Sequence, residues 1–289
     1  MPMSTMGNSV IIAKKEFQDL VNSKLVLIAL GLFILFALFN LHDTINFDYA
    51  GVNKNLFEPY SVFEITLNYT LYVLTSFGRF VAIVIGFSCI AGERHNNALN
   101  VLTTKPLYRD TIINGKIIGV FYFLICVYGV TVLLYTSSFL LLYGNILESN
   151  IVDYLARVVL ILVISVVYSL IYVSLSMLIA LLVKSQALAL VLSMMAIVVI
   201  DDIKTSGFAG YIKLIANGLF GMNPDNVMIN YLSASWLIDW ILLDVRPFSP
   251  SLSLGDILSK ANGYLLALAL YFITPTILSY IVFVWRDVR

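Results

Sequence analysis

Long uncharged runs, separated by short charged segments, dominate the pattern of this chain. Residues 25–41 contain no charged side chain, and neither do residues 117–147. A helix needs about 20 apolar residues to cross the hydrocarbon core of a bilayer, which is roughly 30 Å thick. Because the runs approach or exceed this length, the pattern predicts helices that span a membrane.

Six apolar runs define the predicted spans. They cover residues 24–39, 69–91, 117–142, 157–183, 187–203 and 262–285. Only three residues, Lys184 to Gln186, separate the fourth span from the fifth, so these two should form a helical hairpin. We therefore predict an all-α polytopic membrane protein, with residues 1–289 forming a single transmembrane domain.

An amphipathic segment precedes the first span. Within residues 9–24, apolar residues recur at helical spacing, with charged residues between them: Val10, Ala13, Phe17 and Leu20 or Val21. A helix with one apolar and one charged face favours the surface of a membrane. We predict an N-terminal interfacial helix here.

The loop at residues 204–261 is not uniformly polar. Its stretch 226–244 is rich in Trp, Leu and Ile, and Trp236 and Trp240 share a helix face. We interpret it as one or two interfacial helices on, or dipping into, the outer leaflet, where tryptophan is favoured. The alternative is a seventh and an eighth span that form a re-entrant pair.

The charged residues are distributed unevenly between the two sides of the predicted bundle. Only 12% of the residues are charged, against about 25% in soluble domains. The side that holds both termini carries ten basic and five acidic residues, and the opposite side carries five basic and twelve acidic residues. Basic residues favour the cytoplasmic side, so we predict cytoplasmic termini. The net charge of zero gives no indication of a nucleic-acid partner.

The densest charged segment lies between the second and third spans, at residues 92–116. Glu93 and Arg94 open it at the edge of the membrane, and Arg109 and Lys116 should return the chain to the anionic inner surface. So many charges in so apolar a chain indicate a cytoplasmic docking element.

A short apolar helix is expected inside this segment. Ala98, Leu99 and Leu102 recur at helical spacing. Pro106 ends the helix, because the residue before a proline resists helical geometry.

The spacing G-E-R-x4-L-x2-L-x3-P-x2-R-x5-G-K over residues 92–116 resembles the signature of ABC-2 type permeases. The six-span branch that includes the permease of the nitrous oxide reductase maturation system is the most similar. The resemblance covers the whole chain in topology, and its motif covers these 25 residues. The chain departs from the family pattern at Asn97-Ala98, where Gly-Thr is common, and at Ser88, where an acidic residue is frequent.

The resemblance implies a membrane-spanning permease subunit, an exporter, in the plasma membrane of a prokaryote. A separate ABC ATPase would dock on a cytoplasmic coupling helix between the second and third spans. The residues implied in this coupling are Glu93, Arg94, Leu99, Leu102, Pro106 and Arg109. A second copy of the chain would complete a homodimer, and ATP and Mg would be bound by the ATPase.

The chain itself lacks a nucleotide site of the phosphate-loop type. Asn114-Gly115-Lys116 superficially suggests one, but the motif needs glycine where Asp110 stands and Ser or Thr where Ile117 stands. No metal-binding or nucleophile motif is evident either. We expect no enzyme activity and no cofactor in this chain.

Arg79 interrupts the second predicted span. It precedes Glu93 by 14 residues, or about 21 Å of helix. A central arginine costs about 2.5–3.5 kcal/mol on insertion scales, so it should face protein or water. Two interpretations stay open: Arg79 lines the pathway and favours anionic cargo, or it snorkels outward or pairs with Glu64 or Asp153.

Two other classes of function are alternatives to a permease. The first is a non-transporting membrane scaffold, such as an immunity or assembly factor on the same fold. The second is an ion-coupled secondary transporter, which would be expected to carry intramembrane carboxylates. No predicted span has an acidic residue near its middle. The apolar, aromatic outer loop slightly favours a lipid-like cargo.

Overall fold

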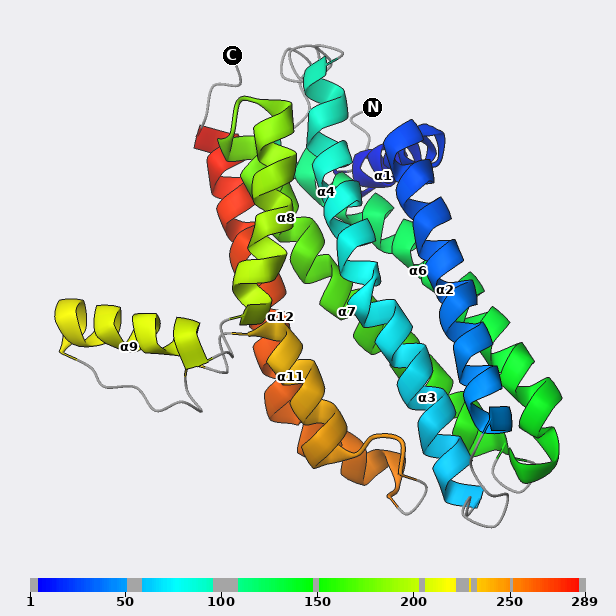
Figure 1. Ribbon diagram of the computed structural model, residues 1–289. Helices are drawn as coiled ribbons and strands as arrows, with labels where there is room; N and C mark the ends of the chain where they lie inside the picture. The colour runs from blue at the N-terminus through cyan, green and yellow to red at the C-terminus, as the bar shows by residue number, and fades with distance from the viewer. Residues whose placement is uncertain are drawn as a thin grey trace.

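The computed structural model describes residues 5–50, 59–95, 109–147, 151–202, 206–221, 229, 233–249 and 252–285. Every regular element in these ranges is a helix. The longer helices run side by side as an elongated bundle, and the start of α1 and the end of α12 lie at the same end of it (Figure 1).

Within the described ranges, seven helices build the bundle. They are α2 (Lys24–Ala50), α3 (Pro59–Ser76), α4 (Gly78–His95), α6 (Arg109–Leu147), α7 (Ile151–Leu182), α8 (Gln186–Asp202) and α12 (Leu254–Trp285). α3 and α4 follow one another along one line, and only Phe77 separates them (Figure 1).

Five segments of the described chain are long and apolar enough to cross a membrane. They lie in α2, in α3 together with α4, in α6, in α7 and in α12. The predicted fifth span corresponds to α8, which is apolar but has 17 residues, or about 26 Å of helix. The predicted class, an all-α polytopic membrane protein, is confirmed.

Several helices extend beyond the spans predicted for them. α2 continues from residue 39 to Ala50, and α6 begins at Arg109 instead of residue 117. With 39 residues, α6 is about 58 Å long. The prediction followed uncharged runs, which measure the apolar layer, whereas backbone hydrogen bonds continue a helix into the polar region beyond it.

α7 forms the centre of the bundle. It packs against α3, α4, α6, α8 and α12. Its small polar residues Ser165, Ser169 and Ser176 are buried in these contacts. At Gly86, α4 approaches so closely that a Cβ would lie 2.5 Å from the Val173 carbonyl oxygen. Small residues permit such contacts, which drive the association of helices in lipid.

The N-terminal helix α1 (Thr5–Asn22) packs tightly on α6. A Cβ at Gly119 would lie 2.7 Å from the Ala13 carbonyl oxygen, and one at Gly115 would lie 2.7 Å from the Ile12 side chain. These two glycines are four residues apart and form a small-xxx-small pair on α6. They form the surface of α6 on which α1 lies.

The packed face of α1 differs from the predicted apolar stripe. Ala13 and Leu20 are buried, as the stripe requires, but Val10 is 63% exposed. Glu16 is buried instead, with 5% of its surface exposed. A carboxylate enters this face because it has a cationic partner on α6.

Three further helical elements lie in the described part of the segment that follows α8. They are α9 (Ser206–Phe220), α11 (Ala234–Trp240) and the π-helical turn η2 (Ile241–Val245). α9 projects sideways from the bundle, whereas α11 continues in line with α8 (Figure 1). The outer-leaflet prediction for residues 226–244 stays a prediction, but α11 does not lie apart from the other helices.

α11 is packed within the bundle, against α8 and α12. Its residues Ala234, Leu237, Ile238 and the following Ile241 are buried. Their helical spacing gives a packing stripe, which the tryptophan content obscured. α11 and η2 together are about 18 Å long, too short to form a span of their own.

The close approach of α1 to α6 yields a stability prediction. Gly119→Val places side-chain atoms against the Ala13 backbone, and overpacking of this kind costs about 1–3 kcal/mol. We expect a lower midpoint of thermal unfolding for the purified protein in detergent. Gly129→Val is the matched control on α6, because nothing lies within 4 Å of a Cβ at Gly129. Equal midpoints for the two variants would contradict the packing described for α1.

Candidate functional site

A buried ion pair joins three helices near the end of α4. Lys116 Nζ on α6 lies 2.7 Å from Glu16 Oε2 on α1, and it donates a hydrogen bond of 2.8 Å to the Cys89 carbonyl oxygen on α4. The Lys116 and Glu16 side chains are 1% and 7% exposed. We refer to Glu16, Cys89 and Lys116 as the α1–α4–α6 junction.

The position of Lys116 corrects an expectation from the sequence. Lys116 ends the charged segment and was expected to face the anionic membrane surface, but it points into the protein, where Glu16 neutralises it. Glu16 was not identified as a site residue, because it is 100 residues away and nothing local marks its partner. Its place between Ala13 and Leu20, on the same helix side, is the signal that could have revealed it.

A second contact attaches α8 to the last part of α4. The Gln186 side chain, at the first residue of α8, donates a hydrogen bond of 3.3 Å to the Ala91 carbonyl oxygen. α4 is therefore held near its end by α1, α6 and α8. A displacement of this end of α4 must be shared by the helices attached to it.

The predicted coupling residues are only partly within the described chain. Leu99, Leu102 and Pro106 lie outside the described residues. Glu93 and Arg94 belong to the last turn of α4, and Arg109 is the first residue of α6, but their side chains also lie outside the described part. The hydrogen bond from Lys116 to Cys89 shows that the two helices joined by this segment are adjacent.

A polar cleft of about 430 Å³ lies between α3, α4, α7 and α11. Its polar lining residues are Tyr72, Thr75, Ser76, Arg79, Tyr168, Ser235 and Asp239. α3 and α4 lie on one side and α11 on the other, in line with α8 (Figure 1). The cleft is therefore lined by a cationic side chain, Arg79, and by an anionic one, Asp239.

The break between α3 and α4 positions Arg79. α3 ends at Ser76, whose carbonyl oxygen accepts a hydrogen bond of 3.0 Å from Arg79 Nε. The guanidinium carbon of Arg79 lies 5.5 Å from the centre of the Phe80 ring, a distance at which a cation attracts the ring face. Arg79 thus lines a cavity, where the end of α3 and the Phe80 ring of its own helix hold it.

The alternatives for Arg79 named Glu64 or Asp153 as its ionic partner. Asp153 instead contacts Arg157 Nε at 2.8 Å. The acidic residue that shares the cleft with Arg79 is Asp239 on α11. Sequence reasoning missed Asp239, because the expected surface position of its segment placed it away from the second span.

Arg157, near the start of α7, has a structural role. It is completely buried, and besides Asp153 it donates hydrogen bonds to the carbonyl oxygens of Pro247 and Leu252. These bonds attach the connection between η2 and α12 to α7. Arg157 therefore fixes the loop that leads from α11 into the last helix.

A set of hydroxyl groups lies next to the cleft. Tyr168, which lines the cleft, lies 3.0 Å from the hydroxyl of Tyr172. Behind them, the hydroxyls of Tyr128 and Ser169 are 2.6 Å apart. Of these four residues, only Tyr168 lines the cleft, and the contact between Tyr128 and Ser169 joins α6 to α7 in the interior.

The described residues hold no group of three or more His, Cys, Asp or Glu side chains that could bind a metal ion. They do contain a bundle of apolar helices, a polar cleft within it and a buried ion pair that connects α1, α4 and α6. These features define a polytopic helical membrane protein.

The family comparison gives the more specific class. Residues 10–288 match the family described as ABC-2 family transporter protein. The chain belongs to this family and is a permease-type membrane component of an ABC transporter. The match is to the family as a whole, so the similarity to the nitrous oxide reductase branch stays an expectation. No curated protein matches the chain.

The junction yields a prediction about stability. Glu16→Gln leaves the Lys116 charge buried without its anion, and breaking a buried pair in this way costs about 3–5 kcal/mol. We expect a strongly lowered midpoint of thermal unfolding in detergent. Asp19→Asn, which removes an exposed carboxylate from the same helix, should change little.

A double variant separates charge from packing. Glu16→Met with Lys116→Met replaces the pair by apolar side chains, which is often neutral or stabilising. It should recover much of the stability that Glu16→Gln loses. If both variants are as stable as the unmodified protein, the pair does not hold the three helices together.

Proposed function

We propose that this chain is the permease subunit of an ABC exporter and that a separate ATPase drives it by docking on residues 93–109. The proposal rests on the α1–α4–α6 junction. Residues 96–108 connect two adjacent helix ends, and the ion pair holds these ends together with α1. A push on the connecting segment would therefore move several helices as one unit.

α4 is the element that would transmit this push. It has 18 residues, or about 27 Å of helix, between the coupling end and the break at Phe77. Arg79 lies two residues after this break and lines the polar cleft. A tilt of α4 about Phe77 would change the separation between Arg79 and α11, and so the shape of the cleft.

We propose the polar cleft as the cargo pathway. A cleft with both Arg79 and Asp239 offers a cation and an anion to a passing molecule, together with hydroxyl groups from Thr75 and Tyr168. These groups suit a cargo with a polar or charged part. The apolar helices around the cleft would contact its hydrocarbon part.

The full transporter would contain two permease chains and two ATPases, with ATP and Mg bound only by the ATPases. We propose a homodimer in the plasma membrane of a prokaryote, with both termini in the cytoplasm. The export direction is the one that the ABC-2 resemblance implies. The excess of basic residues on the side of the termini supports the orientation.

Docking can be tested with one substitution in the coupling segment. Leu102→Asp puts a charge where an apolar side chain should enter a groove of the ATPase. We expect loss of co-purification with the partner ATPase. Asn100→Asp adds the same charge between the apolar positions of the segment and should leave co-purification intact.

The result has two informative alternatives. Retained binding of the Leu102→Asp variant would contradict docking at residues 93–109. Binding to the ATPase without any ATP-dependent movement of cargo would favour the alternative function, a scaffold or assembly factor on the same fold.

The cargo pathway is tested separately at Arg79. Arg79→Ala removes the cleft's cation, so ATP-dependent efflux of amphiphilic dyes from vesicles should fall at least tenfold, while folded yield and ATPase binding stay normal. Lys213→Ala, outside the cleft, is the matched control. If Arg79→Ala transports every tested dye normally and only lowers folded yield, Arg79 has a structural role and not a pathway role.

A further inference from the structure

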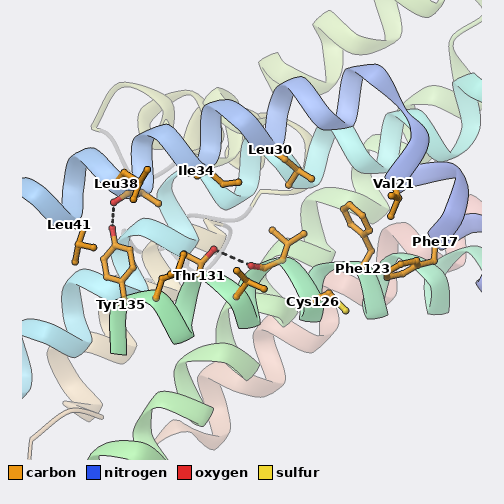
Figure 2. Close-up of a pocket in the computed structure, with 14 residues that line it drawn as sticks. Phe17, Val21, Leu30, Ile34, Leu38, Leu41, Phe123, Cys126, Thr131 and Tyr135 are labelled. Carbon is orange, nitrogen blue, oxygen red and sulfur yellow. Dashed lines mark hydrogen bonds between the residues drawn. The ribbon is translucent and has the colours of Figure 1, made fainter. Parts of the chain in front are cut away.

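An apolar groove of about 350 Å³ lies between α1, α2 and α6. Phe17 and Val21 of α1 close one end of it, and α2 and α6 form its two long sides (Figure 2). It is separate from the polar cleft, with which it shares no residue.

Each long side of the groove is a single helical stripe. α2 contributes Leu30, Ile34, Leu38 and Leu41, which are three or four residues apart. From Leu30 to Leu41, the stripe is about 16 Å long at 1.5 Å per residue. The hydrocarbon core of a bilayer is roughly 30 Å thick, so the groove matches the depth of one leaflet.

The groove is open to the surroundings of the bundle along its length. Ile34 and Leu38 of α2 are 50% and 51% exposed, and Val130 and Leu134 of α6 are 59% and 51% exposed. In a chain that spans a membrane, these surfaces face lipid. A hydrocarbon chain can therefore enter from the side.

The lining offers no polar group to an occupant. The Thr131 hydroxyl donates to the Val127 carbonyl oxygen at 3.0 Å, and the Tyr135 hydroxyl donates to the Ala37 carbonyl oxygen (Figure 2). The second bond also ties α6 to α2 at the end away from α1. The occupant must accordingly be held by apolar contacts alone.

The dimensions favour one hydrocarbon chain over a protein helix. A volume of about 350 Å³ spread over about 16 Å leaves a cross-section of about 20 Å², whereas a helix 10–12 Å in diameter needs about 80–110 Å². A helix of a second copy could cover the groove, but it could not fill it.

A basic residue lies near the end of the groove that α1 closes. Lys14 precedes Phe17 by three residues and Val21 by seven, so the three share a face of α1. Lys14 is exposed, and it lies about one turn of α1 before Phe17. A basic residue at a membrane surface attracts anionic headgroups. No titratable carboxyl, amino or guanidinium group lines the groove itself.

We infer that this groove binds one acyl chain of an anionic phospholipid, from the leaflet on the α1 side, with the headgroup beside Lys14. The inference does not depend on the ATPase or on the direction of transport. The lipid chain would connect α1, α2 and α6 where these helices leave a gap. It would act as a constant part of the bundle and not as cargo.

Photocrosslinking of lipid tests the site. The full chain is reconstituted in phosphatidylcholine vesicles with a rising fraction of phosphatidylglycerol that carries a diazirine on its acyl chain. We expect adducts that saturate at a low fraction and map to residues 30–41 and 123–135. The same diazirine on phosphatidylcholine should give weaker labelling there.

Matched variants separate this site from general contact with lipid. Ile34→Trp fills the groove and should reduce these adducts about tenfold, the effect of about 1.4 kcal/mol of lost binding. Leu35→Trp makes the same change at a position that is equally exposed, at 54% against 50%, but lies outside the groove, and should leave them unchanged. Val130→Trp and Leu133→Trp repeat the comparison on α6.

A separate pair of variants tests the contact with the headgroup. Lys14→Gln should abolish the preference for phosphatidylglycerol over phosphatidylcholine, and Lys15→Gln, on another face of α1, should keep it. If the adducts rise linearly with the lipid fraction and are equal in all tryptophan variants, the label reports only the ordinary surrounding lipid, and the inference fails. If Ile34→Trp changes the oligomeric state and leaves the adducts intact, the groove belongs to an interface between copies, and the inference fails.

Discussion

The buried contact between Glu16 and Lys116 constrains much of the structure around it. Both side chains are almost completely removed from solvent, and Lys116 also reaches the backbone of α4 at Cys89. A buried lysine without its carboxylate is an uncompensated charge in an apolar interior. α1 must therefore stay on α6 while α6 lies beside α4. The N-terminal helix is thus an integral part of the bundle and not a peripheral attachment.

One helix relates this constraint to the polar cleft. α4 ends beside the junction and begins, 18 residues earlier, at the break after Phe77. Polar groups are expensive in an apolar layer, so they gather where they can satisfy one another. Arg79 and Asp239 both line the cleft at the start of α4. Docking and cargo would therefore be connected through the rigid length of a single helix.

The sequence could predict the all-α membrane class and the family, because uncharged runs and the motif at residues 92–116 are local patterns. It could not predict that Lys116 turns inward, because its partner Glu16 lies 100 positions away. Asp239 was missed for a similar reason: the tryptophans of its segment indicated a membrane surface, while Leu237 and Ile238 pack inside. Arg79 could be singled out from the sequence, because a charge within an apolar run is visible without any knowledge of its neighbours; its place in a pathway stays a proposal.

The central claim is that α1, α4 and α6 move as one unit when the ATPase closes. Spin labels can test it by distance measurements on the reconstituted transporter, with Cys126 replaced by serine. The labels are attached to cysteines that replace the named residues. One labelled pair is Asp19 on α1 with Ile118 on α6, and the other is Asp19 with Trp240 on α11. When the complex is trapped with ATP, the first distance should stay constant and the second should change by several ångströms. A changed first distance with a constant second one would contradict the account.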